Sequence, residues 1–307
     1  MISISTSADG VRVLCDDGSV EHGSIVIGAD GVHSRVRHLM RDMAQKAGAT
    51  DLDDEQPFEA TYKVMFGTAP RAAQLRPGGE WESHGPRVTT QLFVGETKMW
   101  FFVYQKLDEP ARRPQRFTRD DEEAYAARWG DVHLTDDLLF RDVYATRLGA
   151  GMTNLEEGIL KNWSWDRIVL VGDAAHKVTP NFGWGFNSGV QDLVVLTNAL
   201  RGLLAQHDGQ LDTATISALF AGYQEERIGF MRKIVELSGR VTRMGAWQNG
   251  AMWLLDRYLF PALHADQWLA RHSVGKMVAK VPVLNFLEEK HFRAGRIPWV
   301  HTANLTR

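Results

Sequence analysis

One stretch of the chain places an acid among glycines at a spacing that suits ligand binding. Residues 168–171 are four consecutive apolar, mostly β-branched residues, which predicts a short strand buried on both faces. Gly172 and Asp173 end this strand, and Gly183 and Gly185 keep the following loop bare and irregular. An acid at the C-terminal end of a strand suits a sugar or polyol hydroxyl, because open α/β sheets hold ligands there. We therefore predict that Asp173 contacts a ligand; the alternative is a turn or capping residue.

The sequence predicts that a helix begins just after these glycines. Apolar residues recur there at helical spacing, starting at Phe186. A helix N-terminus carries unpaired N–H groups and about half a positive charge, and glycines let a flat or anionic ligand approach that backbone. We expect the loop and the start of the helix to form one binding surface. The apolar stripe consists of Phe186, Val190, Leu193, Val194, Thr197 and Leu200.

These residues resemble a known motif. The run Gly-Asp-Ala-Ala-His at 172–176, followed by Pro180 and by Gly183-x-Gly185-x-Asn187, is similar to the second FAD motif of the flavoprotein aromatic hydroxylases. These are class A FAD-dependent monooxygenases of the salicylate or p-hydroxybenzoate hydroxylase type, and they include fungal enzymes of secondary metabolism. The FAD-binding residues that the resemblance implies here are Gly172, Asp173, Pro180, Gly183, Gly185, Phe186 and Asn187.

The resemblance also implies roles within this loop. The helix start near Asn187 would face the flavin pyrimidine, where positive potential stabilises electron density gained on reduction. The alternative is that Asn187 simply caps the helix. We expect His176 to be a packed histidine whose hydrogen bonds are satisfied.

A second strand-and-turn unit precedes the first motif. Residues 24–27 predict a short buried strand, and Gly28-Ala-Asp30-Gly31 follows with Ser34 as an N-cap. This unit is similar to the other FAD and nicotinamide motif of the same family, 143 residues earlier (173 minus 30). The resemblance implies that Asp30 and Gly31 bind the FAD diphosphate region and shape the nicotinamide approach. The alternative is that Asp30 and Gly31 form only a turn and bind no ligand. Arg35 and Arg37 are expected to be surface or helix-stabilising residues; the alternative is contact with a phosphate.

The pattern elsewhere predicts an α/β fold with an antiparallel sheet and a helical C-terminal region, and the resemblance implies that these form an incomplete Rossmann-like FAD-binding domain with an inserted substrate domain. Strands are predicted over residues 2–6, 11–15, 61–66, 88–94, 99–104 and 142–147, and a helix over 120–129. The predicted FAD-binding parts are residues 1–57 and 151–240, the substrate domain is 58–150, and the C-terminal region is 241–307.

Another helix is predicted after Asp212, which would cap it. Its apolar residues follow helical spacing from Ile216 to Leu237, and its charged residues are expected on the outer face. These charged residues are Glu225, Glu226, Arg227, Arg232 and Lys233.

The chain departs from the family pattern at its start. Such enzymes carry Gly-x-Gly-x-x-Gly in a βαβ unit of about 30 residues, with an acid for the adenosine ribose. That segment is not found in this sequence, and residue 1 corresponds to a point well inside the cofactor domain. We expect the strands at 24–27 and 168–171 to expose edges and apolar faces as a result.

Composition limits the classes of partner. The chain has 307 residues, 44% apolar and 24% charged, with a net charge of −3, which is typical of a globular protein and argues against nucleic acid binding. Cys15 is the sole cysteine, so no intrachain disulfide forms and no metal site is expected.

No signal peptide pattern is found, which predicts an intracellular protein, cytoplasmic or peripheral to a membrane. Residues 253–263 are amphipathic enough for weak contact with a membrane surface, the alternative being a packed helix.

The resemblance implies a function. Such enzymes bind FAD, oxidise NAD(P)H, and transfer one atom of O2 to a small apolar or aromatic organic substrate, and few acid or base residues are required. His84 lies roughly where related fungal enzymes carry a tyrosine facing the substrate, which makes it a candidate catalytic residue; otherwise it has no catalytic role. The competing hypotheses are a non-redox relative, acting as a binding module or cyclase-like catalyst, and an inactive fragment.

Overall fold

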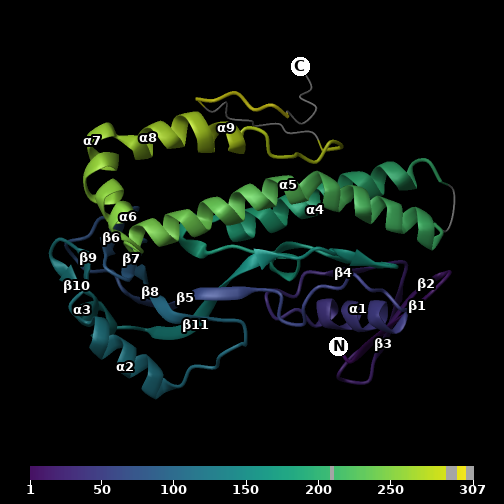
Figure 1. The fold of residues 1–307 in the computed structure, drawn as a ribbon, viewed down its shortest axis with the longest axis horizontal. Coiled ribbons are helices and arrows are strands. Elements are labelled where there is room, and N and C mark those ends of the chain that lie inside the picture. Colours follow the sequence, from purple (N-terminus) through teal and green to yellow (C-terminus); the bar gives the residue numbers. More distant parts are fainter. Residues whose placement is uncertain (208–210, 288–295, 302–307) are drawn as a thin grey trace.

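The computed structural model describes residues 1–207, 211–287 and 296–301. Two long helices, α4 (Trp184–Leu204) and α5 (Thr213–Gly245), run side by side across the molecule (Figure 1). A small mixed sheet and helix α1 (Arg35–Lys46) lie below one end of this helix pair, and a larger antiparallel sheet lies below the other. The helices therefore bridge the two sheets.

The N-terminal region contains two small three-stranded sheets. The strands predicted over 2–6 and 11–15 are confirmed as an antiparallel hairpin: β1 (Ser3–Ser7) pairs with β2 (Gly10–Leu14), which pairs with β3 (Val20–Gly23). In the second sheet, β4 (Val26–Gly28) runs parallel to β13 (Ile168–Leu170). Two segments that are distant in sequence thus end at the same sheet edge.

The expected exposure of the two parallel strands is half right. β13 is fully buried, because β4 flanks it on one side and the short antiparallel strand β12 (Ser164–Trp165) on the other. β4 has a paired neighbour on one side only among the described residues, and its Ile27 is 41% exposed. The expectation of an exposed edge was therefore wrong for β13, since β12 was not predicted from the sequence.

The large sheet has six strands in the order β14-β11-β5-β8-β7-β6, all antiparallel. The sheet continues to Ile159, past residue 150, where the sequence predicted the return to the FAD-binding domain. Its strands are β5 (Glu59–Pro70), β6 (Glu80–Gly85), β7 (Val88–Val94), β8 (Lys98–Ala111), β11 (Gly149–Ile159) and β14 (His176–Lys177).

One face of this sheet packs on short helices. α2 (Arg119–Trp129) has the predicted position, and a small hairpin of β9 (His133–Thr135) and β10 (Leu138–Leu139) follows it. The strand predicted over 142–147 is wrong, because this segment forms helix α3 (Phe140–Ala145). The buried residues of α3 recur at helical spacing and pack against the sheet; they are Phe140, Val143 and Tyr144.

The C-terminal region forms an arm of short helical elements that folds back over α5 (Figure 1). The cap predicted for α5 is confirmed, since Asp212 Oδ1 accepts a hydrogen bond of 2.7 Å from Thr215 N–H. The elements of the arm are α6 (Gly250–Leu254), η3 (Leu255–Leu259), α7 (Phe260–Leu263), α8 (Ala265–Leu269), η4 (Ala270–Val274) and α9 (Gly275–Val278).

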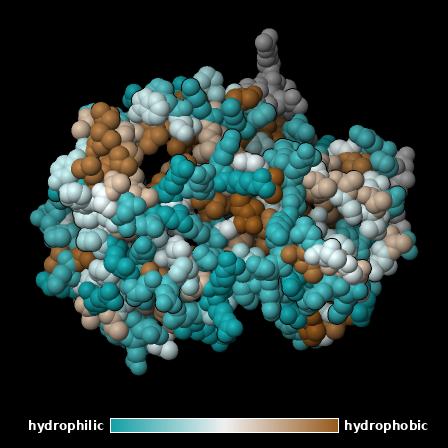
Figure 2. Space-filling view, viewed as in Figure 1, coloured by the Kyte–Doolittle hydropathy of each residue, from teal (hydrophilic) through white to brown (hydrophobic). Residues whose placement is uncertain are grey.

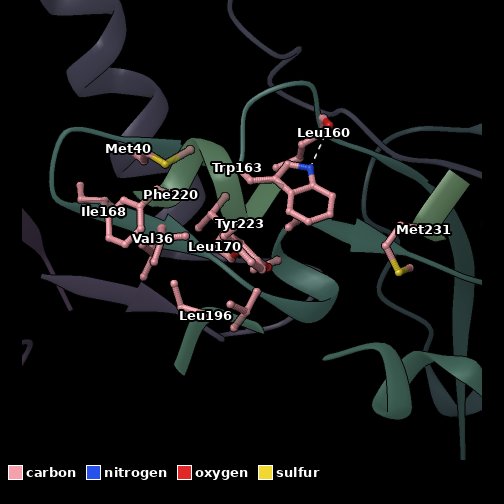
Figure 3. Close-up of a cluster of buried hydrophobic side chains, with 14 of the residues drawn as sticks. Val36, Met40, Leu160, Trp163, Ile168, Leu170, Leu196, Phe220, Tyr223 and Met231 are labelled. Atoms are coloured by element: carbon pink, nitrogen blue, oxygen red, sulfur yellow. Dashed lines mark hydrogen bonds between the residues drawn. The ribbon is translucent and has the colours of Figure 1, made fainter. Parts of the chain in front are cut away.

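The main core lies where α1, β13, α4 and α5 meet (Figure 3). Trp163 is fully buried there, and its indole N–H donates to the Leu160 carbonyl at 3.0 Å. Tyr223 of α5 packs on this indole and donates its hydroxyl to the carbonyl of Leu170. The polar atoms of these large rings are thus satisfied, and the C-terminal end of β13 is fixed against α5.

Gly28 provides a test of how closely the parallel strands approach α1. A Cβ at Gly28 would lie 2.7 Å from Leu170 Cδ2 and 2.9 Å from Val36 Cβ, which is closer than carbon atoms pack. We expect Gly28→Ala to lower the free energy of unfolding by about 1–3 kcal/mol, because the packed side chains must shift. Urea unfolding measures this change.

The matched control is Gly222→Ala on α5, where nothing lies within 4 Å of the added methyl group. This change should raise stability by about 0.5–1 kcal/mol, because alanine favours a helix over glycine. Equal effects at both positions would contradict the close packing of β4, β13 and α1.

Candidate functional site

The two acidic glycine turns predicted from the sequence lie next to each other. β4 and β13 pair in register with Gly28 opposite Leu170, so the turns containing Asp30 and Asp173 both leave the same sheet edge. Arg37 joins them: its guanidinium donates to the carbonyl of Val32 at 2.7 Å and to that of Ala174 at 3.1 Å. The two turns therefore form one continuous surface at this edge of the sheet.

Arg37 corrects an expectation from the sequence. It is 7% exposed and lies over the ring of Phe58, with 5.0 Å between the guanidinium carbon and the ring centroid. Arg37 was expected at the surface or stabilising the helix because arginine is rarely buried, and the two accepting carbonyls cannot be seen in the sequence. Its role is to hold the two turns together.

The carboxylate of Asp30 faces α1. It accepts hydrogen bonds from the backbone N–H of Arg35 at 2.7 Å and of Val36 at 3.0 Å, and from the Ser34 hydroxyl. These bonds cap the helix N-terminus. Gly31 has a φ of 81°, and a Cβ there would meet nothing within 4 Å, so its backbone lies open. A ligand at this turn would meet the Gly31 backbone first.

Asp173 lies between the end of β13 and the start of α4. It sits in the 3-10 turn η1 (Gly172–Ala174), where the positive φ of 59° at Gly172 makes the bend. Its Oδ2 accepts a bond from Lys177 Nζ, while its Oδ1 lies 3.9 Å from the Cβ position at Gly185. Asp173 is 31% exposed, so the carboxylate remains open to a ligand. Lys177 was not singled out in the sequence.

The N-terminus of α4 carries no side-chain cap. The 3-10 turn η2 (Pro180–Phe182) leads to Gly183, which has a φ of 69° and serves as the N-cap residue. Asn187 Nδ2 donates back to the Gly183 carbonyl at 2.9 Å, so this amide does not accept from the helix N–H groups. A helix start without a capping acceptor leaves N–H donors and positive potential available to a ligand. Phe186 beside it is 83% exposed.

A buried charge network holds the loop in place. Asp192 of α4 is 0% exposed, and its Oδ2 accepts a 2.9 Å bond from Gly172 N–H and lies 2.6 Å from His176 Nε2. Its Oδ1 accepts a 2.7 Å bond from Arg227 Nε on α5. Burial raises the pKa of Asp192, but the bonds from His176 and Arg227 outweigh it and lower the pKa overall. The carboxylate stays charged and ties the loop to both long helices.

This network explains which side chains of the two long helices are buried. Arg227 was assigned to the outer face of its helix, yet it is 3% exposed and pairs with Asp192. The apolar stripe that begins at Phe186 is not the buried side of the helix, since Phe186, Val190 and Leu193 are exposed. α4 instead turns inward a face that combines polar Ser188, Gln191 and Asp192 with apolar Trp184, Val195 and Leu196, because Asp192 must reach the loop and Arg227. His176 is packed and satisfied, as predicted.

Polar contacts also join the loop to the large sheet. Gln91 on β7 donates from Nε2 to the Asn181 carbonyl at 3.2 Å, and the hydroxyl of Tyr104 donates to Gln91 Oε1 at 2.8 Å. On the other side, the hydroxyl of Thr242 on α5 contacts Asn181 Oδ1 at 3.0 Å and Thr179 Oγ1 at 2.9 Å. The glycine loop is thus clamped between the sheet and α5.

A surface that we call the aromatic wall lies beside this clamp on the same sheet face. Phe93 is two residues from Gln91 on β7, and Phe102 is the cross-strand partner of Gln91. The rings of Phe93 and Phe102 meet edge to face with centroids 6.0 Å apart. The wall consists of Phe66, Phe93, Trp100 and Phe102, with Phe66 42% and Trp100 43% exposed. The alternation of Trp100, Phe102 and Tyr104 is a sequence signal that could have predicted this face.

His84 lies on the same sheet but at its outer strand, β6. Its Nδ1 lies 2.8 Å from Asp256 Oδ2, and its Nε2 lies 3.3 Å from Glu82 Oε1. Trp247 donates its indole N–H to the same Asp256 at 2.7 Å. The ring packs under α5, since a Cβ at Gly245 would lie 3.3 Å from it. These contacts place His84 between the sheet and the C-terminal arm, and its catalytic role stays a prediction.

A cleft of about 320 Å³ opens beside the Gly31 turn. Its lining is rich in cationic side chains, which suits an anionic group such as a phosphate. The charged and histidine residues lining it are His33, Arg37, His38, Arg112, Arg116 and Glu156.

Solved structures with this architecture define the class. The fold matches a salicylate hydroxylase substrate complex with a TM-score of 0.60 at 18% identity, over 92% of this chain and 70% of that one. It also matches Klebsiella pneumoniae HpxO complexed with FAD and uric acid, with a TM-score of 0.60 at 21% identity, over 82% and 59% of the two chains. The protein thus has the mixed α/β fold of FAD-dependent hydroxylases.

The sequence assigns the family. Residues 16–238 match the family described as FAD binding domain, and the chain belongs to this family of FAD-dependent monooxygenases. The FAD-dependent monooxygenase spyC of Aspergillus fumigatus is 34% identical over 287 residues, which is 91% of this chain and 60% of that protein. The chain therefore spans about 60% of the length of this curated relative. No helix in the described ranges is both long and apolar enough to cross a membrane.

Asp192→Asn tests the charge network. The substitution keeps the shape but removes the charge that balances buried Arg227, so we expect the free energy of unfolding to fall by about 3 kcal/mol. Urea unfolding gives the value. The matched control is Asp131→Asn, which removes a carboxylate paired with Arg141 on the surface, where the pair contributes little. A loss no larger than that of the control would contradict a supporting role for Asp192.

His84→Gln tests the contact with the arm through its pH dependence. Burial lowers the pKa of His84, but the bonds to Asp256 and Glu82 outweigh it and raise the pKa to about 9. A raised pKa adds stability that is complete below about pH 6.5, the ordinary histidine value, and is lost as the pH rises through 9. The substitution should thus cost about 2 kcal/mol at pH 7 and much less at pH 10.

Urea unfolding at both pH values measures the difference. His22→Gln on the exposed strand β3 is the control and should change neither value. A cost for His84→Gln that is equal at pH 7 and pH 10 would show that the charge of His84 does not stabilise the arm.

Proposed function

We propose that this chain forms the flavin-facing and substrate-binding part of an FAD-dependent monooxygenase. The enzyme oxygenates a small apolar or aromatic organic substrate with NAD(P)H and O2, as a step in secondary-metabolite biosynthesis. The observation that carries the proposal is the uncapped N-terminus of α4, which lies beside Asp173 and is joined through Asn181 to the sheet face that bears the aromatic wall. Family membership supports the same activity.

The residues present fit a bound flavin. Gly31 and Gly183 both have positive φ, and a Cβ at either would point into space with no atom within 4 Å, so a flat ring system could approach both turns. The free side of the Asp173 carboxylate suits a polyol hydroxyl. When bound, FAD would supply the redox chemistry between the nicotinamide cofactor and O2.

The chain's own residues would then act by binding and orientation. The N–H groups at Gly185 and Phe186 would stabilise negative charge on the ring that they face, because they belong to the positive end of α4. The Asp192 network would keep these donors in position without reorganisation. No acid or base side chain is required at the reacting carbon, so His84 is not needed as a catalyst.

The aromatic wall would bind the substrate. Phe66 and Trp100 present partly exposed rings on the sheet face that adjoins the glycine loop, and flat apolar molecules stack well on such rings. The arginine-rich cleft beside Gly31 would receive the phosphates of the nicotinamide cofactor. The wall also limits water next to the flavin, which favours transfer of oxygen to the substrate.

Flavin content tests the proposal directly. The protein is expressed, freed of loose cofactor by gel filtration, and its visible flavin absorbance is compared with its protein absorbance before and after addition of FAD. A stoichiometric flavin band, followed by substrate-dependent NADPH or NADH oxidation, is the expected result. A folded chain that binds no FAD would overturn the proposal and favour the non-redox relative.

Gly185→Val locates the flavin. The added side chain would occupy the space between Asp173 and the start of α4, so we expect FAD affinity to fall at least about tenfold, or 1.4 kcal/mol. Gly202→Val makes the same change in the same helix where nothing lies within 4 Å, and it should leave affinity unchanged. Titration of flavin fluorescence measures both. Equal affinities for the two variants would place the flavin elsewhere.

A further inference from the structure

The C-terminal arm, residues 250–280, begins with a nearly continuous helical run through α6, η3 and α7. One side of this run faces the body of the protein. Asp256 on that side contacts His84 and accepts from Trp247, and Phe260 one turn later is half-buried. These inner contacts fix which side of the run faces outward.

The outward side is apolar, which reverses the usual pattern of a surface helix. The large apolar side chains of this run are exposed around most of its circumference: Trp253 (40% exposed), Leu254 (55%), Leu255 (37%), Tyr258 (55%), Leu259 (44%) and Leu263 (64%). Arg257 is the one charged residue among the exposed positions of 251–263, a range that the structure describes in full. An exposed apolar face of this extent marks an interaction surface.

Figure 2 shows this surface as a hydrophobic patch at the upper left, over α7. The next part of the arm adds Trp268, which is 58% exposed, and then exposed basic residues at Arg271, Lys276 and Lys280. Tryptophan and tyrosine at the rim of an apolar surface are typical of the boundary between lipid headgroups and acyl chains.

Charge is distributed unevenly between the arm and the rest of the chain. Residues 250–280 carry four lysines and arginines against two aspartates, a net charge of +2. The whole chain carries −3, so the remainder carries −5. An anionic surface would therefore attract the arm and repel the body.

We propose that the C-terminal arm binds the surface of a lipid bilayer that contains anionic lipids. The apolar face of 251–263 enters the headgroup region, and the basic residues of 271–280 contact lipid phosphates. The arm lies along the interface rather than crossing it, since no described helix has the length and apolarity for crossing. A second copy of the chain fits less well, because two arms of charge +2 repel each other.

Sedimentation with vesicles tests the proposal on the intact chain. Large vesicles of phosphatidylcholine alone and with one quarter phosphatidylserine are mixed with the protein and pelleted. We expect binding to the mixed vesicles that weakens with added salt, and weaker binding to phosphatidylcholine alone. The double variant Leu259→Glu/Leu263→Glu should reduce the bound fraction at least about tenfold, because charges would enter the apolar layer.

The matched control is Leu204→Glu at the end of α4, where the leucine is 57% exposed. It should bind vesicles like the unchanged protein. A second measurement does not depend on whether the double variant folds. Brominated lipid should quench the tryptophan fluorescence of the unchanged protein, and Trp268→Phe should remove part of that quenching.

Three results would overturn the proposal. The first is no pelleting with either vesicle at low salt, and the second is equal loss of binding in the control and the double variant. The third is a concentration-dependent dimer that forms without lipid and is abolished by Leu259→Glu/Leu263→Glu, which would assign the apolar face to a second copy. FAD binding by the double variant should be unchanged, so the outcome is independent of the proposed enzymatic function.

Discussion

The buried carboxylate of Asp192 is the constraint on which the candidate site depends. A charge without exposure to water is costly unless partners surround it, and here the Gly172 N–H, His176 and Arg227 occupy both of its oxygens. Because these partners come from η1, β14 and α5, one carboxylate on α4 fixes the loop relative to the large sheet and both long helices. The exposed donors at the start of α4 are therefore held rigid without any contact of their own.

The same constraint explains what the sequence could and could not predict. The two strand-turn-helix units were predictable, because glycines, buried β-branched runs and capping residues act locally, as at Asp212 and Ser34. The inward face of α4 was not, because periodicity favours burying Phe186 over Asp192, and the partner that reverses this preference lies 35 residues away in sequence. The burial of Arg37 could not be predicted either, because its hydrogen-bond acceptors are backbone carbonyls, which every residue carries.

The large sheet contributes to the site through one polar row rather than through its core. Gln91 and Tyr104 form a hydrogen-bonded pair that reaches the loop at Asn181, and Thr242 meets the same residue from α5. The rings of the aromatic wall continue directly from this row. Any shift of the sheet would thus move the wall and the loop together, which keeps the distance between them constant.

Polar contacts also position the C-terminal arm, at the other end of α5. Its inner contacts are polar and specific, with Asp256 shared by His84 and Trp247, and its outer residues are apolar. Burial of each exposed leucine would lower the free energy, so their exposure is not favoured by packing within the chain. The bonds to Asp256 fix the orientation of the helix. The apolar face is therefore held outward by interactions within the protein, as expected for a surface that receives something else.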